Sequence, residues 1–313
     1  MSEEKKKIDW SDECWKEMLV YQRKFAWFED TLDKLAAWLG LKPGMTAVDV
    51  GCGLGYLGYT YWPYFGKGGC YFGVDMSSQL LQDAAKAAKE WALDGEVCFT
   101  AGDVHQLPFP DDFADLVMCQ ALLMHLEKPE LALAEMVRVA RPGGLVMCKE
   151  PDNLSPMLAK RYWSLPELNI EEQLLFAKVT ITCNKGRIKL GQGDNSIGTK
   201  VPRMMHKLGL TDIGIRLNDR VFYLEPPYGD PLQKHSLKSV KRELLDEKRR
   251  KNLTDRAKKE FLAGGGDPEE FDRYQKINDR IMSILRQQIE DGEYFACGST
   301  DFYIIKGRKS KRM

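Results

Sequence analysis

The chain has 313 residues, of which 43% are hydrophobic and 29% are charged. This composition is typical of ordinary globular proteins, and the length allows one large domain or a core with an accessory part. The 46 basic residues balance the 46 acidic residues, so the formal net charge is zero. A neutral balance disfavours a nucleic-acid partner, because proteins that bind nucleic acids usually carry a basic excess.

The eight cysteines are scattered and form no CxxC pair, which favours free thiols in a reducing compartment over a disulfide framework. The start, MSEEKKKIDW, lacks the apolar stretch of a signal peptide, and no apolar run reaches the length of a transmembrane helix. We therefore expect a cytoplasmic protein with no membrane partner, and no metal site is predicted.

Apolar residues recur at helical spacing between Ser11 and Leu39, which predicts two helices that end near Gly40. From there on, short apolar runs alternate with longer helical patterns. Strands are predicted at 46–50, 70–74, 96–101, 114–119 and 145–149, and helices at 56–65, 79–91 and 130–140. This alternation predicts βαβ units, and hence an α/β fold with a doubly wound, parallel sheet.

The alternation breaks after Glu150. Helical patterns follow at 158–163, 170–180 and 197–208, and a sixth strand is predicted at 212–217. Residues 230–290 are highly charged and helical in pattern, with an interruption at Gly264-Gly265-Gly266. A final strand is predicted at 296–306, and the basic tail Lys309–Met313 is expected to be disordered.

These patterns predict four parts. Residues 1–40 form an N-terminal helical cap, and residues 41–224 form the core, which includes a cap insertion at 151–189. Residues 225–292 form a charged helical insertion, and residues 293–313 supply the final core strand and the basic tail. Since acidic residues interleave with the basic ones, a solvated helical surface is the default interpretation of the insertion. It could also serve as a lid or a dimerisation arm.

The strongest local signal is Asp49-Val50-Gly51-Cys52-Gly53-Leu54-Gly55, between a predicted buried strand and a predicted helix. Glycines let the backbone pass close beneath a ligand, and the first turn of a helix presents free N–H groups. Residues 53–58 also match the GxGxxG of dinucleotide-binding proteins, which alone is weak evidence. An acid two positions before the first glycine favours a ligand with an ammonium group and no pyrophosphate.

Two further acids follow predicted strands. Asp75 closes the second strand, where its carboxylate can accept hydrogen bonds from both hydroxyls of a ribose; this would suit NAD equally well. Asp103 follows the third strand, where it can accept from an adenine amino group while the next backbone N–H donates to a ring nitrogen. Gly143-Gly144 is expected to make the tight turn into the fifth strand.

In chain order, VDVGCGLG, FGVD, AGDVHQLPF, the run from Phe113 to Leu126, and RPGGLV resemble the motifs of class I S-adenosylmethionine-dependent methyltransferases. The most similar group is the type 11 small-molecule group. The resemblance is strong over Leu41–Lys149 and weaker from Gly191 to Leu217. It implies S-adenosylmethionine as the cofactor and a Rossmann-like, mostly parallel sheet of seven strands, the last of them antiparallel.

The resemblance also implies roles for single residues. It puts the 49–55 motif near the methionine part of the cofactor, Asp75 on the ribose, and Gln120 close to the methyl donor. It puts Asp103 and Val104 on the adenine, with Met76 against the adenine face. The cofactor-binding residues expected in the first motif are Asp49, Gly51, Cys52, Gly53 and Gly55.

Other side chains are candidates with an open alternative. His125, just after the fourth strand, could act as a general base, or it could pack the loop. Tyr21 could touch the cofactor carboxylate and Trp27 could cover the site, or these helices could simply pack their aromatic face on the core. In type 11 relatives the first insertion contacts substrate, and the candidates there are Arg161, Tyr162 and Trp163.

Glu225-Pro226-Pro227-Tyr228 resembles the (D/N)PPY motif of amino-methylating DNA and RNA enzymes. In those enzymes the motif follows the fourth strand, where this chain has Cys119-Gln120-Ala121-Leu122. A proline turn that ends the sixth strand is therefore the better interpretation.

The sequence thus predicts transfer of a methyl group from S-adenosylmethionine to a nucleophilic atom of a small-molecule acceptor by in-line displacement. One alternative is an RNA or protein methyltransferase that docks its substrate on residues 230–290. Another is a non-catalytic subunit that binds the cofactor. A homodimer through the helical insertion is a further expectation. Nitrogen, oxygen, sulfur and carbon acceptors share these motifs, so the acceptor atom is not predicted.

Overall fold

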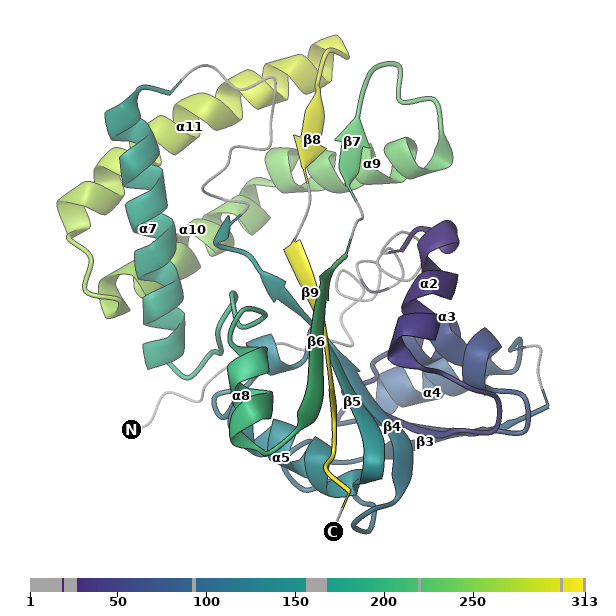
Figure 1. Ribbon diagram of the computed structural model, residues 1–313. Coiled ribbons are helices and arrows are strands. Elements are labelled where there is room, and N and C mark those ends of the chain that lie inside the picture. Colours follow the sequence, from purple (N-terminus) through teal and green to yellow (C-terminus); the bar gives the residue numbers. More distant parts are fainter. Residues whose placement is uncertain are drawn as a thin grey trace.

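The computed structural model describes residue 19 and residues 27–91, 94–155, 168–218, 221–298 and 301–311. Figure 1 shows two parts: a sheet with helices on both faces, and a group of helices beyond one end of that sheet. Among the described residues, no helix is both long enough and apolar enough to span a membrane.

Seven strands of the described chain form one sheet in the order β3-β2-β1-β4-β5-β9-β6. They are β1 (Thr46–Val50), β2 (Cys70–Asp75), β3 (Glu96–Ala101), β4 (Ala114–Gln120), β5 (Ala140–Asp152), β6 (Thr211–Leu217) and β9 (Asp301–Arg308). Strands β1 to β5 pair in parallel, whereas β9 is antiparallel to both β5 and β6. The predicted doubly wound, seven-stranded sheet with an antiparallel last strand is therefore confirmed.

Both faces of the central strands β1, β4 and β5 are buried, which explains their continuous apolar runs. Alternate residues of each strand point to opposite faces. On one face Val48, Val117 and Val146 pack against α5 (Pro129–Val139) and α8 (Val201–Lys207). On the other face Leu116 and Met147 pack against a second set of helices. That set consists of α2 (Glu29–Leu39), α3 (Tyr56–Phe65) and α4 (Ser78–Ala88).

The helix ends follow local sequence signals. Ser77 caps α4 by accepting a hydrogen bond from the backbone N–H of Leu80 at 3.4 Å. Pro129 stands in the first turn of α5, where a missing N–H costs nothing. Gly40 ends α2 in the left-handed conformation, with φ of 75°, as glycine does at many helix ends.

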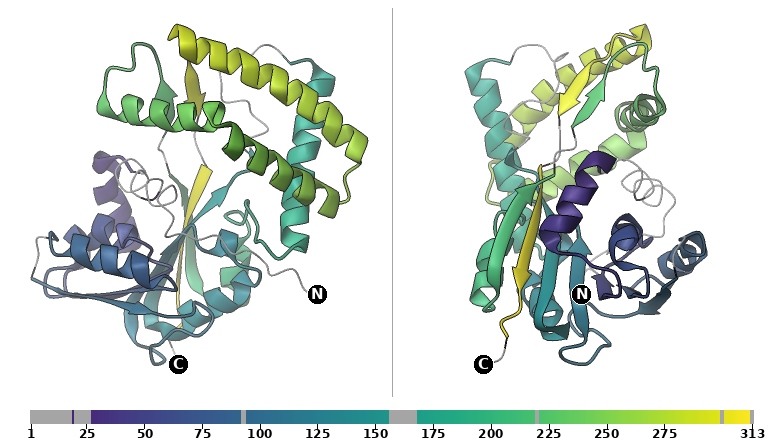
Figure 2. Two further views of the ribbon diagram at one scale, coloured as in Figure 1. Left: turned by 180° about the vertical axis from the view of Figure 1, so that it is seen from behind. Right: turned by 45° about the vertical axis from the view of Figure 1, so that its right-hand side comes forward.

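The remaining elements form a helical subdomain, defined here as residues 168–190 and 221–298 (Figure 2). Its elements are α7 (Ile170–Lys189), β7 (Phe222–Leu224), α9 (Pro231–Leu245), α10 (Glu247–Ala263), α11 (Pro268–Asp291) and β8 (Ala296–Gly298). It has apolar clusters of its own, such as Leu175 and Val179 against Phe261 and Phe271. The two insertions predicted from the sequence therefore lie together.

Helix α7 approaches α10 closely. A Cβ added at Gly186 would lie 1.6 Å from the backbone oxygen of Glu260, so only glycine fits there. Next to it, the buried Arg187 guanidinium pairs with the Glu260 carboxylate at 3.0 Å. Removal of one partner of such a buried pair is strongly destabilising.

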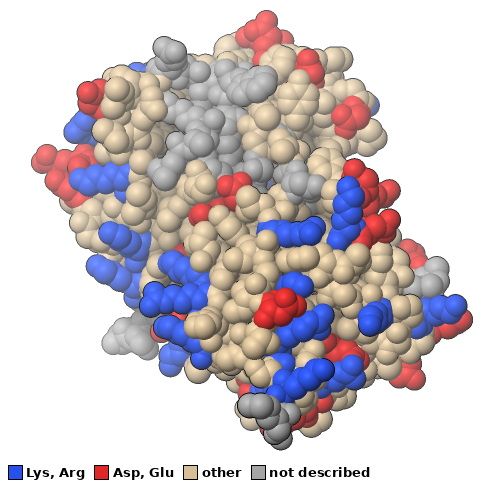
Figure 3. Space-filling view, viewed as in Figure 1, with Lys and Arg blue, Asp and Glu red and all other residues tan. Residues whose placement is uncertain are grey.

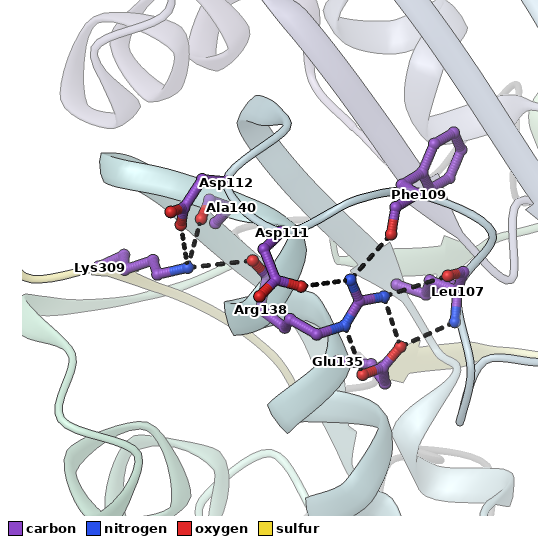
Figure 4. A network of polar contacts seen from close by, with 8 residues as sticks. All are labelled: Leu107, Phe109, Asp111, Asp112, Glu135, Arg138, Ala140 and Lys309. Atoms are coloured by element: carbon purple, nitrogen blue, oxygen red, sulfur yellow. Dashed lines mark hydrogen bonds and ion pairs between the residues drawn. The ribbon is translucent and has the colours of Figure 1, made fainter.

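Three expectations for the C-terminal third were wrong in detail. The strand predicted at 296–306 is two strands, because β8 pairs with β7 in a separate two-stranded sheet and β9 enters the main sheet. The Glu225–Tyr228 turn follows β7 rather than the sixth strand. The basic tail is not wholly disordered, since Lys309 lies partly buried against α5 and β5, with its ammonium 2.6 Å from the Asp112 carboxylate (Figure 4).

Candidate active site

The register of the sheet aligns several strand ends at one edge. Val50 pairs with Val74, which brings Gly51 level with Asp75, and Asp49 pairs with Met118, which brings Gly51 level with Gln120. Gln120 in turn pairs with Lys149. We call the row Asp75, Gly51, Gln120 and Lys149 the edge row. It crosses the point between β1 and β4 where the strand order reverses, which is where doubly wound sheets bind ligands.

At the centre of the edge row the backbone carries no side chains, because the residues there are glycines. Gly51, Gly53 and Gly55 have φ of 67°, 51° and 72°, a region that side chains rarely tolerate. A Cβ at Gly51 would lie 2.7 Å from Leu122 Cδ1, so this loop packs against the loop that follows β4. Among the described residues, a Cβ at Gly53 would meet only Leu19 Cδ1, at 3.9 Å. The described part of the chain thus leaves room for a ligand atom beside the backbone of Gly53.

Asp75 connects the end of β2 to this loop. One carboxylate oxygen accepts a hydrogen bond from the backbone N–H of Gly53, and the other accepts from the N–H of Ser77, both at 2.9 Å. Each oxygen of a carboxylate can accept a further bond. Asp75 is therefore held in place and still able to accept hydrogen bonds from a diol.

Met76 and Asp103 follow on the outer side of Asp75. The Met76 side chain is 66% exposed, which is unusual for a large apolar residue. Asp103 accepts a hydrogen bond from the backbone N–H of His105 at 2.9 Å and remains largely exposed. Val104 packs, partly buried, against the core. An apolar surface and a carboxylate acceptor are thus available at neighbouring strand ends.

The loop that follows Asp103 is held by Arg138 of α5 (Figure 4). The guanidinium donates to the backbone oxygens of Phe109 at 2.8 Å and Leu107 at 3.1 Å, and it pairs with Glu135. The Glu135 carboxylate also accepts from the N–H of Leu107 at 2.9 Å. This network supports the loop and lies away from the edge row.

Asp49 and Cys52 face inward. The Asp49 carboxylate is buried and accepts hydrogen bonds from the Tyr71 hydroxyl, at 2.7 Å, and from the backbone of Gly58 in α3. Burial raises the pKa of Asp49 to about 7. The Cys52 thiol is buried as well, and burial raises its pKa. In this structure the Asp49 carboxylate supports the glycine loop from its buried side. Contact of this side chain with a cofactor ammonium stays a prediction.

The loop after β4 is anchored by a residue that the motifs did not reveal. Glu150, buried on β5, accepts hydrogen bonds from the backbone N–H groups of Leu122 at 2.9 Å, Leu123 at 3.0 Å and Met124 at 3.3 Å. Burial raises the pKa of Glu150 to about 7. Next to this loop the Gln120 side-chain oxygen is buried with no hydrogen-bond partner among the described residues.

His125 ends the short 3-10 helix η1 (Leu123–His125) in the same loop. Burial, together with the guanidinium of Arg256 in α10, lowers the pKa of His125 to about 4. The imidazole is therefore neutral near pH 7, as a proton acceptor must be, although a pKa this low makes it a weak base. Its role as general base stays a prediction.

Lys149 was also not predicted. It is 1% exposed, and its ammonium lies 3.8 Å from the centroid of the Trp27 ring and 4.9 Å from that of Phe302. Trp27 packs edge-on against Tyr61 of α3, with the ring centroids 5.6 Å apart. Trp27 therefore packs on the core, next to Lys149, and its role in covering the cofactor or the substrate stays a prediction. The available signal was a lysine that directly follows the apolar run Leu145–Cys148 in a predicted strand.

Tyr21, Arg161, Tyr162 and Trp163 lie outside the described residues, so their candidate roles stay predictions. In the described ranges, no group of three or more His, Cys, Asp or Glu side chains is arranged to hold a metal ion.

Residues 41–207, more than half of the chain, match the methyltransferase domain family. The chain therefore belongs to this family, and the resemblance to class I S-adenosylmethionine-dependent methyltransferases is confirmed.

Individual relatives share only parts of their length with this chain. A methyltransferase of Schizosaccharomyces pombe is 42% identical over 113 residues, which are 34% of this chain and 40% of that protein. The demethylmenaquinone methyltransferase of Lysinibacillus sphaericus is 31% identical over 133 residues, 42% of this chain and 54% of that protein. The chain thus matches about half or less of the length of these relatives.

Among solved structures, the YcgJ protein of Bacillus subtilis is similar, with a TM-score of 0.49 and 16% identity over 91% of this chain and 100% of that one. Phosphoethanolamine N-methyltransferase 2 of Haemonchus contortus, in complex with S-adenosyl-L-methionine, has a TM-score of 0.48 and 15% identity over 96% of this chain and 59% of that one.

Proposed function

We propose that this chain transfers a methyl group from S-adenosylmethionine to a nucleophilic atom of a small-molecule acceptor. The observation that carries the proposal is the edge row, in which a bare glycine backbone lies between an anchored acid, Asp75, and the polar ends of β4 and β5. When bound, the cofactor supplies a methyl group already activated by a sulfonium.

The described residues fit this cofactor. The open space beside Gly53 accommodates a ligand against the backbone, and Asp75 has acceptor capacity for two ribose hydroxyls. The exposed Met76 offers an apolar surface to an adenine ring, with Asp103 and the N–H of Val104 at its rim. Gly51, Gly55 and Cys52 contribute backbone, and Asp49 keeps that backbone in place.

The chain's own groups then have to position an acceptor. Gln120 lies next to Gly51 in the edge row and offers a buried oxygen to an acceptor group. Trp27 covers the neighbouring Lys149 and keeps water from this end of the row. Correct orientation of two reactants can contribute about 7–11 kcal/mol toward lowering the barrier. A proton acceptor such as His125 is required only for an acceptor that arrives protonated.

Docking of RNA on the helical subdomain is disfavoured by the charges there. In Figure 3 the basic side chains gather over the core, whereas the helical subdomain carries both signs. Ion pairs such as Lys258 with Asp272, at 3.0 Å, neutralise charges there. Several relatives are named demethylmenaquinone methyltransferases, which also favours a small acceptor.

One experiment tests this function. The protein is incubated with methyl-labelled S-adenosylmethionine and a metabolite extract, and labelled products are identified by mass spectrometry. We expect one labelled small molecule that is absent when Gly53→Ala protein is used. Absence of transfer across broad extracts contradicts the proposal. Cofactor binding without turnover favours the non-catalytic alternative, and salt-dependent association with RNA favours the RNA alternative.

We further propose that two copies of the chain pair through α7, which lies in the cap insertion and not in the charged insertion 225–292 through which a dimer is expected from the sequence. Its outer side carries a stripe of exposed apolar residues at heptad spacing: Ile170, Leu174, Ile181 and Ile188, between 38% and 70% exposed. Glu171 near the start of the helix and Lys189 at its end favour an antiparallel second copy, in which these opposite charges meet.

Sedimentation tests the dimer. We expect the wild type to sediment as a dimer and the double variant Leu174→Asp, Ile181→Asp as a monomer. Leu253→Asp on α10, at a residue 48% exposed, is the matched control and should remain dimeric. A monomeric wild type excludes this pairing.

A further inference from the structure

His105 contacts the carboxylate of Asp103 twice, just after the end of β3. Its backbone N–H donates to Asp103 Oδ1 at 2.9 Å, and its ring nitrogen Nδ1 lies 2.9 Å from the same oxygen. An ionised carboxylate only accepts hydrogen bonds, so Nδ1 carries the hydrogen in this contact. Both contacts of His105 therefore fall on one oxygen of Asp103.

The backbone on either side of Asp103 is held as well. The N–H of Gly102 donates to the backbone oxygen of Asp75 at 3.1 Å, and the N–H of Gln106 donates to that of Asp103 at 3.0 Å. Further along, the Arg138 guanidinium supports the same loop (Figure 4). The freedom that remains to the carboxylate is rotation about its own side-chain bonds.

The imidazole of His105 restricts this rotation. The last torsion of an aspartate side chain is broad, because it joins a tetrahedral carbon to a planar one. A hydrogen bond from the ring to an ionised oxygen is about twice as strong as a neutral one, and it fixes which oxygen points toward His105. The Asp103 side chain is 70% exposed and that of His105 is 35% exposed, so a ligand can reach the fixed carboxylate.

We propose that His105 is a positioning residue for the cofactor. It turns Asp103 Oδ2 toward the 6-amino group of the adenine, and the site thereby selects a 6-aminopurine over a 6-oxopurine. A carboxylate accepts from the amino group, whereas a 6-oxo group is a second acceptor and leaves the pair without a hydrogen. A site built for one hydrogen bond rejects an analogue that cannot form it. The inference rests on the proposed function, because it assumes that Asp103 lies at the adenine of S-adenosylmethionine.

Isothermal titration with two cofactor analogues tests the inference without turnover. S-adenosylhomocysteine carries the 6-amino group, and S-inosylhomocysteine carries a 6-oxo group in its place. We expect the wild type to bind the adenosyl compound about ten-fold or more tightly. His105→Ala should weaken the adenosyl compound by about 2- to 12-fold, because the carboxylate is no longer pre-oriented, and should leave the inosyl compound unchanged. The preference narrows by the same factor.

Further variants separate positioning from a structural role. His105→Phe keeps the ring without the donor and should behave like His105→Ala, whereas His105→Gln supplies an amide donor and should recover part of the preference. His206→Ala removes an exposed histidine on α8 and should match the wild type. Once Asp103 is replaced by alanine, His105→Ala should no longer change the preference. A general loss of structure, which thermal unfolding measures, would weaken both compounds equally.

Any of three results overturns the inference. The first is equal affinity of the wild type for the two compounds. The second is a preference in both His105→Ala and His105→Phe that equals that of the wild type. The third is tighter binding of S-adenosylhomocysteine by His105→Ala, which would mean that the ring competes with adenine for Asp103. Failure of the proposed function is distinguishable, because a wild type that binds with the expected preference but transfers no methyl group leaves the role of His105 intact. A wild type that binds neither compound contradicts both.

Discussion

Replacement of Gly53 by alanine separates a ligand contact from backbone strain. Gly53 has φ of 51°, and within the described ranges a Cβ there would meet only Leu19 Cδ1 at 3.9 Å. Gly68 is a matched control, with φ of 65° and no atom of a described residue within 4 Å of an added Cβ. A side chain in this left-handed region costs roughly 1–2 kcal/mol. Both variants should therefore lose about the same free energy of unfolding, which urea denaturation measures.

The two variants should differ in cofactor affinity. If S-adenosylmethionine lies against the Gly53 backbone, the new methyl group enters space that the ligand fills, and such overpacking costs about 1–3 kcal/mol. This corresponds to a loss of about 5- to 150-fold in affinity for S-adenosylhomocysteine, measured by isothermal titration. Gly68→Ala should bind like the wild type. Equal affinities of Gly53→Ala and Gly68→Ala would refute the proposed location of the cofactor.

Four further outcomes are expected. Asp75→Asn should weaken S-adenosylhomocysteine binding by about 10- to 150-fold, since hydrogen bonds to a charged acceptor contribute about 1.5–3 kcal/mol; wild-type affinity would exclude the ribose role. Because burial raises the pKa of Asp49 from 3.8 to about 7, its contribution to the free energy of unfolding is full below about pH 4 and falls, by up to about 4 kcal/mol, as the pH rises to about 7. Asp49→Asn should therefore lose less stability than the wild type in urea titrations between pH 4 and pH 8, and identical pH profiles would contradict the buried, raised-pKa carboxylate. With the acceptor identified from the extract, His125→Asn should lower the single-turnover rate about 10²- to 10⁴-fold if His125 is the base, and an unchanged rate removes it from that role. Lys309→Met should lower the free energy of unfolding by about 1–3 kcal/mol, because the Lys309 ammonium lies between Asp112 and two backbone oxygens. A denaturation midpoint equal to that of the wild type would show that these contacts do not stabilise the fold.

The core elements could be predicted closely because local signals coincide there. Strand β1 and helix α3 have the predicted bounds, since an apolar run ends at the glycines and a helical pattern starts directly after them. The final strand could not be predicted in the same way. Its alternating pattern continues through Ala296–Lys306, whereas the division into β8 and β9 depends on distant partners, Leu224 for Ala296 and Glu150 for Tyr303.

The candidate site shows the same division. Gly51, Gly53 and Asp75 belong to contiguous motifs, so their neighbourhood could be expected from the sequence. Lys149 and Glu150 acquire their surroundings only from the fold. Lys149 contacts Trp27, which lies far away in the sequence. Glu150 accepts its hydrogen bonds from backbone N–H groups of the loop that follows the neighbouring strand, β4. No periodicity in the chain reports such contacts.

The way in which the helical subdomain is inserted into the main sheet affects how this protein can vary. Strand β9 lies between β5 and β6, and the chain from 221 to 298 leaves and returns between β6 and β9. Where the inserted segment joins the sheet, the backbone N–H of Asn218 donates a hydrogen bond to the backbone oxygen of Phe302 at 2.8 Å. This bond holds the two ends of the insertion side by side. Because the entropic cost of closing a loop grows only slowly with its length, inserts of very different sizes are tolerated between β6 and β9. Related proteins could therefore have a different or larger insertion at this point while the register of Asp75, Gly51, Gln120 and Lys149 stays the same.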